Sequence, residues 1–388
     1  MFSERTRWNR QENELTLTRE RLRVSGQTVL DLTRSNPTEC GFAYDQEGIR
    51  RALVRGEVLR YRPEARGLLA AREAVTAYYN NQHGEAVAPA DLLLTASTSE
   101  AYSFLFRLLC NAGDEVLIPA PGYPLFDFLA DLCDVKLVRF PLVYDHGWQM
   151  DIAALAAART ERTRAVVVVH PNNPTGHYVS NAERRRLEEF CGARGMALVV
   201  DEVFLDFSLR EEPARSFVNS QGVLTFTLSG LSKVCGMPQM KLAWIAVSGP
   251  EAEKREALER LEVIADAYLS VGTPVQTAAP ALLEIRRSFQ ERVTNRVRKN
   301  LGELDRLLAQ QKVCARLECE GGWTAVLRVP AVQSDEQLAI ALLNDKNVLV
   351  HPGHFYDFAW PGYIMVSLIV PEPEFAEGIK RVLTHLGG

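Results

Sequence analysis

The feature that most restricts the folds open to this chain is a series of short apolar segments alternating with helical patterns between about residues 90 and 250. The segments are rich in β-branched residues and apolar almost throughout, whereas a strand with one solvated face alternates apolar and polar residues. Strands of this kind are buried on both faces, so we expect an α/β fold with a mainly parallel, seven-stranded sheet and right-handed crossovers. The predicted strands are 92–97, 115–119, 135–140, 165–170, 197–201, 224–229 and 242–247.

Helical patterns separate these strands and dominate residues 252–311. Helices are predicted over 98–111, 124–132 and 181–194, and Ser180 with Glu183 forms a capping-box pattern at the start of the third. We predict three parts: an N-terminal segment that joins the small domain (1–45), a large α/β domain (46–275), and a connecting helix with a smaller α+β domain (276–388). Residues 272–274, Gly-Thr-Pro, predict an interruption before that helix, and a closing helix is expected from about Glu374.

Charge and cysteine content exclude several classes of protein. The 388 residues carry a net charge of −5 without a long basic run, which argues against nucleic-acid or anionic-membrane partners. Seven cysteines without a C-x-x-C pair indicate reduced thiols and argue against a metal site. The first 24 residues mix acids and bases, which is unlike a signal peptide, and no apolar run is long enough to span a membrane. We expect a cytoplasmic protein.

Five local motifs follow predicted strands, at the edge where open α/β sheets bind ligands. In the first, Thr98 and Ser99 begin a helix whose free N–H groups could bind a phosphate, although a plain N-cap is the alternative. In the third, Asn173 lies in a rigid turn and could hold its amide toward the crevice, or form nothing more than a turn. The motifs are TASTSEA (95–101), PGYP (121–124), HPNNPTG (170–176), DEVF (201–204) and SGLSK (229–233).

Two charged residues complete the set. Asp201 ends a buried strand, where an acid is usually exposed or capping but could hold a protonated heterocyclic nitrogen. Lys233 could be an ordinary surface lysine. In a crevice with Lys241 as a cationic neighbour, its pKa would fall and it could serve as a Schiff-base nucleophile.

Together the five motifs resemble the fold-type I, pyridoxal-phosphate (PLP)-dependent class I/II aminotransferases, the aspartate aminotransferase-like family. Residues 31–38 (DLTRSNPT) look like the family's loop at the site, and 61–75 (YRPEARGLLAAREAV) look like its Tyr-x-Pro…Gly…Leu-Arg segment. The resemblance covers nearly the whole chain. It implies a PLP enzyme that transfers an amino group between an amino acid and a 2-oxo acid (EC 2.6.1.-).

The resemblance also implies a role for individual residues. Lys233 matches the lysine that forms a Schiff base with the cofactor and later moves the proton, and Asp201 matches the acid that keeps the pyridine nitrogen protonated. Asn173 matches the donor to the phenolic oxygen, and Tyr123 matches the aromatic residue that stacks on the ring. Positions matching phosphate contacts are Thr98, Ser99, Ser232 and, from the neighbouring subunit, Tyr61, which implies a homodimer with shared active sites.

The chain departs from the family pattern at informative positions. Phe204 stands where a tyrosine commonly donates to the phenolic oxygen, and Gly230 replaces a frequent phosphate-binding serine. Lys241 replaces an arginine that grips the phosphate, which keeps the charge but loses the bidentate fork. Met365 occupies the place of the arginine that clamps the substrate α-carboxylate.

The replacement for that clamp is open at the level of sequence. Arg34, next to Ser35 in the N-terminal loop, is the nearest candidate. Arg34 could equally be a surface arginine or part of a structural ion pair, and the substrate could lack an α-carboxylate in the usual place. The loss of the clamp also keeps a second function open, a PLP-dependent lyase or a biosynthetic cyclase or mutase. A cofactor-sensing regulator is disfavoured, because only about 30 residues precede the loop.

Overall fold

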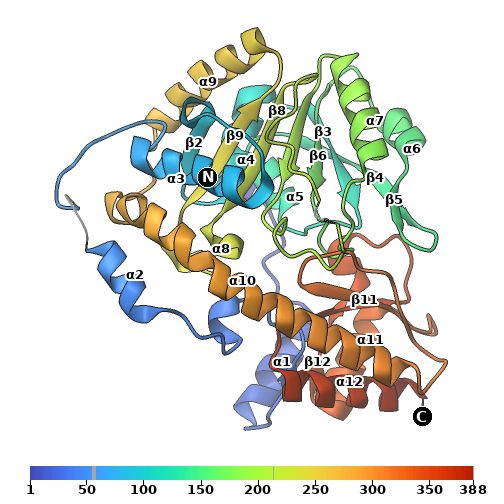
Figure 1. Cartoon of the computed structure of the whole chain (residues 1–388). Coiled ribbons are helices and arrows are strands. Elements are labelled where there is room, and N and C mark those ends of the chain that lie inside the picture. Colours follow the sequence, from blue (N-terminus) through green and yellow to red (C-terminus); the bar gives the residue numbers. More distant parts are fainter. Residues whose placement is uncertain (55–57, 213, 388) are drawn as a thin grey trace.

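The computed structural model describes residues 1–54, 58–212 and 214–387, and its larger sheet has the strand order β2-β9-β8-β7-β6-β3-β4-β5 (Figure 1). The predicted strands are confirmed, with ends that shift by a few residues. The strands are β2 (Leu92–Thr95), β3 (Glu115–Ala120), β4 (Lys136–Tyr144), β5 (Trp148–Met150), β6 (Thr163–Val169), β7 (Ala197–Asp201), β8 (Thr225–Gly230) and β9 (Ala243–Ser248).

The mainly parallel arrangement is also confirmed. Strands β8, β7, β6, β3 and β4 run parallel, and β9 lies antiparallel between β2 and β8. The prediction of seven strands was wrong by one, because β5 forms an antiparallel hairpin with the extended end of β4. β5 has only three residues, too few for a period-2 pattern to stand out.

Helices cover both faces of this sheet. Successive residues of a strand point to opposite faces, so two neighbouring residues show which helices pack on each face. Val199 of β7 packs in the same cluster as α4 (Thr98–Leu109), α5 (Phe126–Asp131) and α9 (Glu251–Asp266). Its neighbour Val200 packs with α6 (Ile152–Ala158) and α7 (Asn181–Gly192). On the same side, α3 (Leu69–His83) packs against β2 and β9. The capping box at the start of α7 is confirmed.

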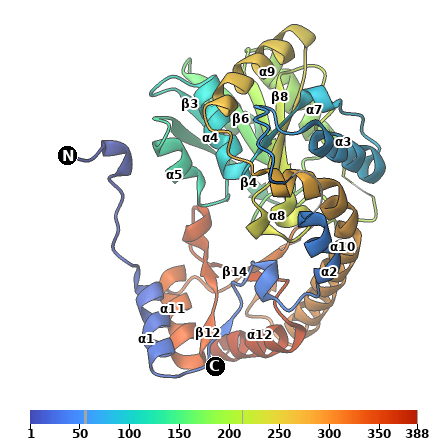
Figure 2. The same ribbon diagram turned by 90° about the vertical axis from the view of Figure 1, so that its left-hand side faces the viewer.

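One long helix, α10 (Thr273–Leu308), runs along both parts of the molecule (Figures 1 and 2). It contacts α2 (Gln46–Leu53) and α3 near its start and α12 (Glu372–Gly387) further on. The predicted interruption before this helix is confirmed: Gly272 is its N-cap, and Pro274 lies in its first turn. In the described residues, no helix combines the length and apolar character needed to cross a bilayer.

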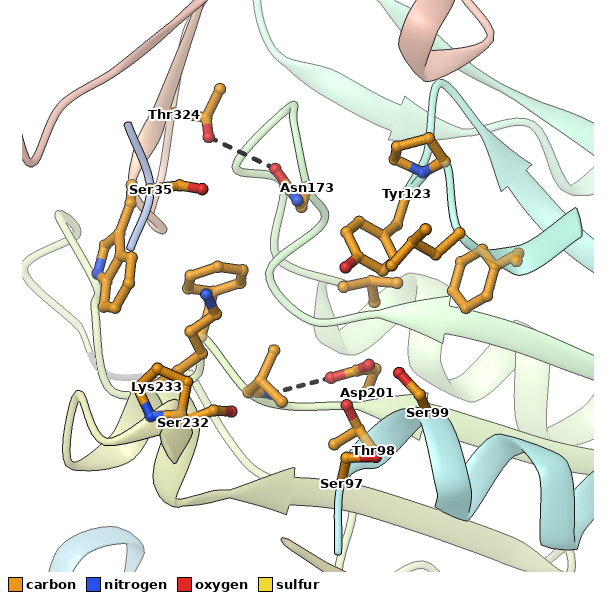
Figure 3. Close-up of a pocket in the computed structure, with 18 of the residues that line it drawn as sticks. Ser35, Ser97, Thr98, Ser99, Tyr123, Asn173, Asp201, Ser232, Lys233 and Thr324 are labelled. Carbon is orange, nitrogen blue, oxygen red and sulfur yellow. Dashed lines mark hydrogen bonds between the residues drawn. The ribbon is translucent and has the colours of Figure 1, made fainter. Parts of the chain in front are cut away.

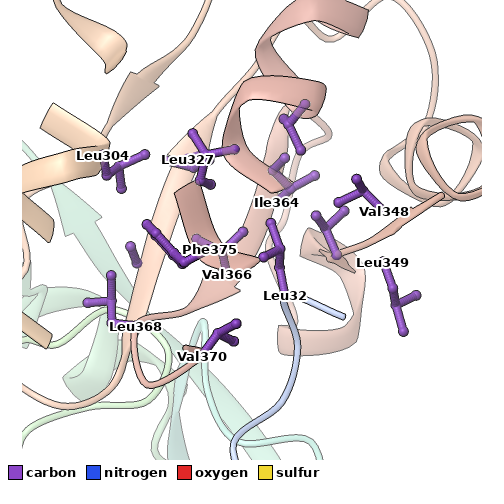
Figure 4. Close-up of a cluster of buried hydrophobic side chains, with 14 of the residues drawn as sticks. Leu32, Leu304, Leu327, Val348, Leu349, Ile364, Val366, Leu368, Val370 and Phe375 are labelled. Carbon is purple, nitrogen blue, oxygen red and sulfur yellow. The ribbon is translucent and has the colours of Figure 1, made fainter. Parts of the chain in front are cut away.

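The smaller part is built from both ends of the chain. Leu32 is completely buried among Ile364, Val366 and Phe375 (Figure 4), and β1 pairs in parallel with β12. The division of the chain into domains at residues 45 and 275 remains a prediction. The elements of this part are α1 (Glu14–Val24), β1 (Leu30–Asp31), β10 (Ala315–Arg316), β11 (Thr324–Arg328), α11 (Asp335–Lys346), β12 (Val348–Leu349), β13 (His351–Pro352), β14 (Tyr363–Ser367) and α12.

Candidate active site

A cavity of about 440 Å³ opens at the carboxyl ends of β6, β7 and β8, where the smaller sheet meets the larger one (Figure 3). Most residues singled out in the sequence line it, although they are scattered over more than 300 positions. Tyr61 and Arg34 do not line it. The predicted residues that do are Ser35, Thr98, Ser99, Tyr123, Asn173, Asp201, Phe204, Ser232, Lys233, Lys241 and Met365.

Lys233 lies on the short helix α8 (Leu231–Val234), which directly follows β8. Its Nζ lies over the rings of Phe204 and Trp323, 5.4 and 5.1 Å from their centroids. Burial lowers the pKa of Lys233 to about 8, although Asp201 and Cys40 act in the opposite direction. An amine with this pKa is partly neutral near pH 7, which is the form that attacks an aldehyde.

Asp201 is the last residue of β7 and is buried. Its Oδ1 accepts a hydrogen bond from the Val203 N–H, and its Oδ2 accepts one from the Tyr102 hydroxyl, both at 3.1 Å. Burial raises the pKa of Asp201 to about 6 despite these bonds. In the described part of the chain no cationic side chain lies within ion-pair distance of this carboxylate, so the site suits a ligand that brings a cationic N–H.

The first turn of α4 faces the same cavity. Ser97 is the N-cap, and its Oγ accepts a hydrogen bond from the Glu100 N–H at 3.1 Å. The hydroxyls of Thr98 and Ser99 therefore do not provide the cap, and both residues line the cavity together with Ser232 and Lys241. Hydroxyls, helix N–H groups and an ammonium form a donor set that suits a phosphate.

The turn after β6 holds Asn173 toward the cavity (Figure 3). Its neighbour Asn172 makes the internal bonds of the turn: Oδ1 accepts from Thr175 Oγ1 at 2.9 Å, and the N–H donates to the His177 carbonyl at 2.8 Å. Asn173 Oδ1 accepts a hydrogen bond from Thr324 Oγ1 at 3.4 Å. Its amide nitrogen is then the donor available to a ligand.

Two departures from the family pattern have a structural reason. A Cβ atom at Gly230 would lie 2.8 Å from the Ala243 Cβ, so the backbone of β9 leaves no room for a serine. Phe204 packs edge-on against Trp323 with centroids 5.2 Å apart, and its ring also borders the Lys233 amine. A phenyl ring provides an apolar wall here, and it cannot donate a hydrogen bond.

Sequence reasoning missed several residues of the cavity wall, among them Tyr102, Trp323, His351 and Tyr356. Tyr102 follows Ser99 by three positions on α4, so helical spacing could have placed it on the same face. Trp323, His351 and Tyr356 belong to the smaller part, and no local pattern marks them. His351 and Tyr356 lie beside Met365 on the wall where the family's arginine is replaced.

Arg34 points away from the cavity. Its guanidinium forms an ion pair with Glu374 of α12, and only its chain neighbours Thr33 and Ser35 line the cavity. We expect Arg34→Met to lower the free energy of unfolding by no more than ~1 kcal/mol, because the ion pair is partly exposed. Urea denaturation measures this change. Because Arg34 does not line the cavity, the variant should leave the ratio of kcat/KM for an amino acid and for its neutral amide unchanged, whereas a selective loss for the acid would identify Arg34 as a carboxylate ligand.

Tyr61 is 76% exposed and lies in a separate shallow hollow with Leu94, Phe104 and Leu269. It does not reach the cavity of its own chain.

The lysine, the aspartate and the donor-rich helix start at the carboxyl edge of an α/β sheet define a cofactor-dependent enzyme. The sequence profile of the family described as aminotransferase class I and II matches residues 38–382, and the chain belongs to this family, whose members use PLP. It is thus an aminotransferase (EC 2.6.1.-) that acts on amino acids and 2-oxo acids.

Individual relatives agree with the family. The chain is 26% identical over 382 residues to the glutamate-pyruvate aminotransferase AlaA of Escherichia coli strain K12, covering 95% of this chain and 93% of that protein. It is 30% identical over 242 residues to the S-alkyl-thiohydroximate lyase SUR1 of Arabidopsis thaliana, covering 62% of this chain and 52% of that protein. The solved structure of the alanine aminotransferase from Pyrococcus furiosus has the same fold, with a TM-score of 0.89, 22% identity and full coverage of both chains.

Proposed function

We propose that this aminotransferase holds PLP in the cavity through Lys233 and accepts small amino acids, with L-alanine or L-glutamate and pyruvate as the first substrates to test. The observation that carries the proposal is the pairing of Lys233 and Asp201 in one cavity, the first with a lowered and the second with a raised pKa. The names of the relatives, glutamate-pyruvate and alanine aminotransferase, support the choice of substrates.

The donors of the cavity fit each part of the cofactor. Asp201 would accept the N–H of the protonated ring nitrogen, and Asn173 would donate to the phenolic oxygen. Tyr123 would stack on the ring, and Phe204 would leave the phenolic oxygen with one donor fewer than in tyrosine-containing relatives. The phosphate would be held by Thr98, Ser99, Ser232 and Lys241.

When bound, PLP supplies an electron sink for the charge that develops on the substrate carbon. Lys233 would have two tasks: its neutral amine would hold the cofactor through the aldehyde, and it would serve as the base that takes and returns the proton of the substrate carbon. Asp201 would accept the hydrogen bond of the protonated ring nitrogen and so keep that nitrogen protonated during the reaction. Trp323 and Phe204 border the lysine with apolar surface and help to keep water away from the reacting atoms.

We also propose a homodimer in which Tyr61 contacts the phosphate bound by the other subunit. The exposure of Tyr61 and its position outside the lining of its own chain's cavity support this assignment. Mixing Lys233→Ala chains with Tyr61→Phe chains would test it, because each hybrid dimer contains one site that carries neither change. We expect such mixtures to recover activity above that of either parent, and no recovery would contradict shared sites.

The proposed function is tested by mixing cofactor-loaded enzyme with L-alanine or L-glutamate and recording the cofactor absorbance. Transfer predicts stoichiometric loss of the aldehyde form of the cofactor, release of the matching 2-oxo acid, and return of the signal when pyruvate is added. No absorbance change with any amino compound would contradict the proposal.

A lyase is the second candidate, and the similarity to SUR1 over 242 residues favours it. Met365, in place of a carboxylate-binding arginine, is a further reason to test substrates that are not simple amino acids. Product analysis separates the two candidates, since elimination releases ammonia or a thiol and leaves the cofactor unaminated.

A further inference from the structure

The cavity wall around Met365 is formed by two short antiparallel strands. His351 of β13 is the direct register partner of Met365 of β14. Side chains of directly opposed residues leave the same face of a sheet, with Cβ atoms about 5 Å apart. Both residues line the cavity. A substrate group that contacts Met365 is therefore also close to the His351 ring.

A tyrosine holds this ring in place. His351 Nδ1 lies 3.0 Å from Tyr356 Oη, and the two ring centroids are 5.8 Å apart. Tyr356 lines the cavity as well and is only 9% exposed. Nε2 makes no hydrogen bond with residues 1–54, 58–212 or 214–387. A protonated ring held in this way donates through Nδ1–H to Tyr356 and offers Nε2–H to a ligand.

The cavity contains few groups that can carry positive charge. Among its described lining residues these are Lys233, Lys241 and His351. The proposed function, on which this inference rests, uses both lysines for the cofactor. The carboxylate of a bound amino acid still needs a cation or several donors in a closed site.

We propose that His351 binds the substrate carboxylate in place of the arginine that Met365 replaces, and that Tyr356 is its positioning residue. An imidazolium fills the role with a single N–H in place of a guanidinium fork, so it binds more weakly, and it contributes a positive charge only when the ring is protonated.

The surroundings of His351 make this binding depend on pH. Burial lowers the pKa of the ring, Asp31 raises it and Arg19 lowers it, and Arg19 and Asp31 lie 3.9 Å apart as an ion pair. A carboxylate bound to Nε2 stabilises the charged ring, so binding takes up a proton and weakens as pH rises. The titratable and charged groups around the ring are Tyr356, Asp31 and Arg19 and, across the cavity, Lys233, Lys241, Asp201 and Tyr123.

The direct test is the binding of propanoate, a carboxylate without an amino group, to the cofactor-loaded enzyme by isothermal titration calorimetry. The wild-type Kd should rise about 3- to 10-fold per unit between pH 6.5 and 8.5, with proton uptake visible in buffers of different ionisation enthalpy. His351→Gln should bind propanoate about 30-fold more weakly at pH 6.5 and lose the dependence. Tyr356→Phe should weaken propanoate binding less than His351→Gln does, and it should shift the pH dependence of Kd. Arg34→Met is the matched control, and it should bind propanoate as the wild type does.

The second test compares L-alanine with L-alaninamide in the half-reaction. His351→Gln should lower the acid-to-amide ratio of kcat/KM by at least about 30-fold. Introducing Met365→Arg into that variant should restore the preference for the acid. An equal loss for both compounds, or wild-type binding of propanoate by His351→Gln, would overturn the assignment. If the wild-type enzyme consumed neither amino compound, the proposed function would fail, while the propanoate titration would still decide the role of His351.

Discussion

Lys233→Ala should abolish covalent attachment of the cofactor while the chain stays folded. The amine of Lys233 lies over the rings of Phe204 and Trp323, and burial lowers its pKa to about 8 although the charge of Asp201 acts in the opposite direction. Without this amine, the cofactor aldehyde has no nucleophile and the substrate carbon has no base. We expect the half-reaction with L-alanine to slow by at least ~10³-fold, which corresponds to ~4 kcal/mol of barrier.

The measurement is reduction with borohydride, followed by mass analysis of the chain and of its peptides. Wild-type protein should gain the mass of the reduced cofactor on the peptide that contains Lys233, and the variant should gain none. Lys241→Ala is the matched control, since it removes another lysine of the cavity but leaves the nucleophile in place. Retained labelling in Lys233→Ala would assign the covalent bond to a different lysine.

Asp201→Asn should leave the fold intact and slow the half-reaction by ~10³-fold, or about 4 kcal/mol of barrier. An amide cannot keep the ring nitrogen protonated, so the negative charge on the substrate carbon would be poorly stabilised. The Val203 N–H can still donate to the amide oxygen, and the Tyr102 hydroxyl, which bonds the other carboxylate oxygen in the wild type, can accept from the amide nitrogen. Stopped-flow absorbance with L-alanine measures the rate, and a rate within tenfold of the wild type would remove Asp201 from the chemistry.

The same variant should stabilise the protein when no cofactor is present. Folding raises the pKa of Asp201 from an ordinary ~3.9 to about 6, so the protonated form is favoured in the fold. The folded state therefore loses stability as pH rises from about 4 through 6. Above pH 7, the free energy of unfolding measured by urea denaturation should be roughly 2–3 kcal/mol higher for Asp201→Asn than for the wild type. Below pH 4 this difference should vanish. An equal stability difference at both pH values would mean that the substitution acts through packing and that the charge of Asp201 is not its cause.

Much of the larger sheet could be predicted because its strands are buried on both faces. Val166 to Val169 or Leu198 to Val200 form continuous apolar runs, and few other structures accommodate them. The convergence of Asn173, Asp201 and Lys233 was also predictable, since each lies at or just after the carboxyl end of a neighbouring strand. Strands β1, β12 and β13 of the smaller part have only two residues each, which is too short for a reliable pattern.

The wall of the cavity formed by β13 and β14 could not be predicted from the sequence, because it too depends on very short strands. His351 reaches the cavity only because β13 pairs with β14 in one particular register. The partner of Arg34 is Glu374, 340 positions away, so the sequence could not distinguish a substrate ligand from a structural ion pair. Local spacing carries no information about contacts of this range.

The joining of the two chain ends has a consequence for synthesis of the protein on the ribosome. The strands of the larger sheet all lie between residues 92 and 248, so that part can form while later residues are still being added. Leu32 and β1 must wait much longer, because their partners Val348, Ile364 and Phe375 lie more than 300 positions further along the chain. Until then the first forty residues expose apolar side chains, and a nascent chain stalled before residue 340 is the form we expect chaperones to bind.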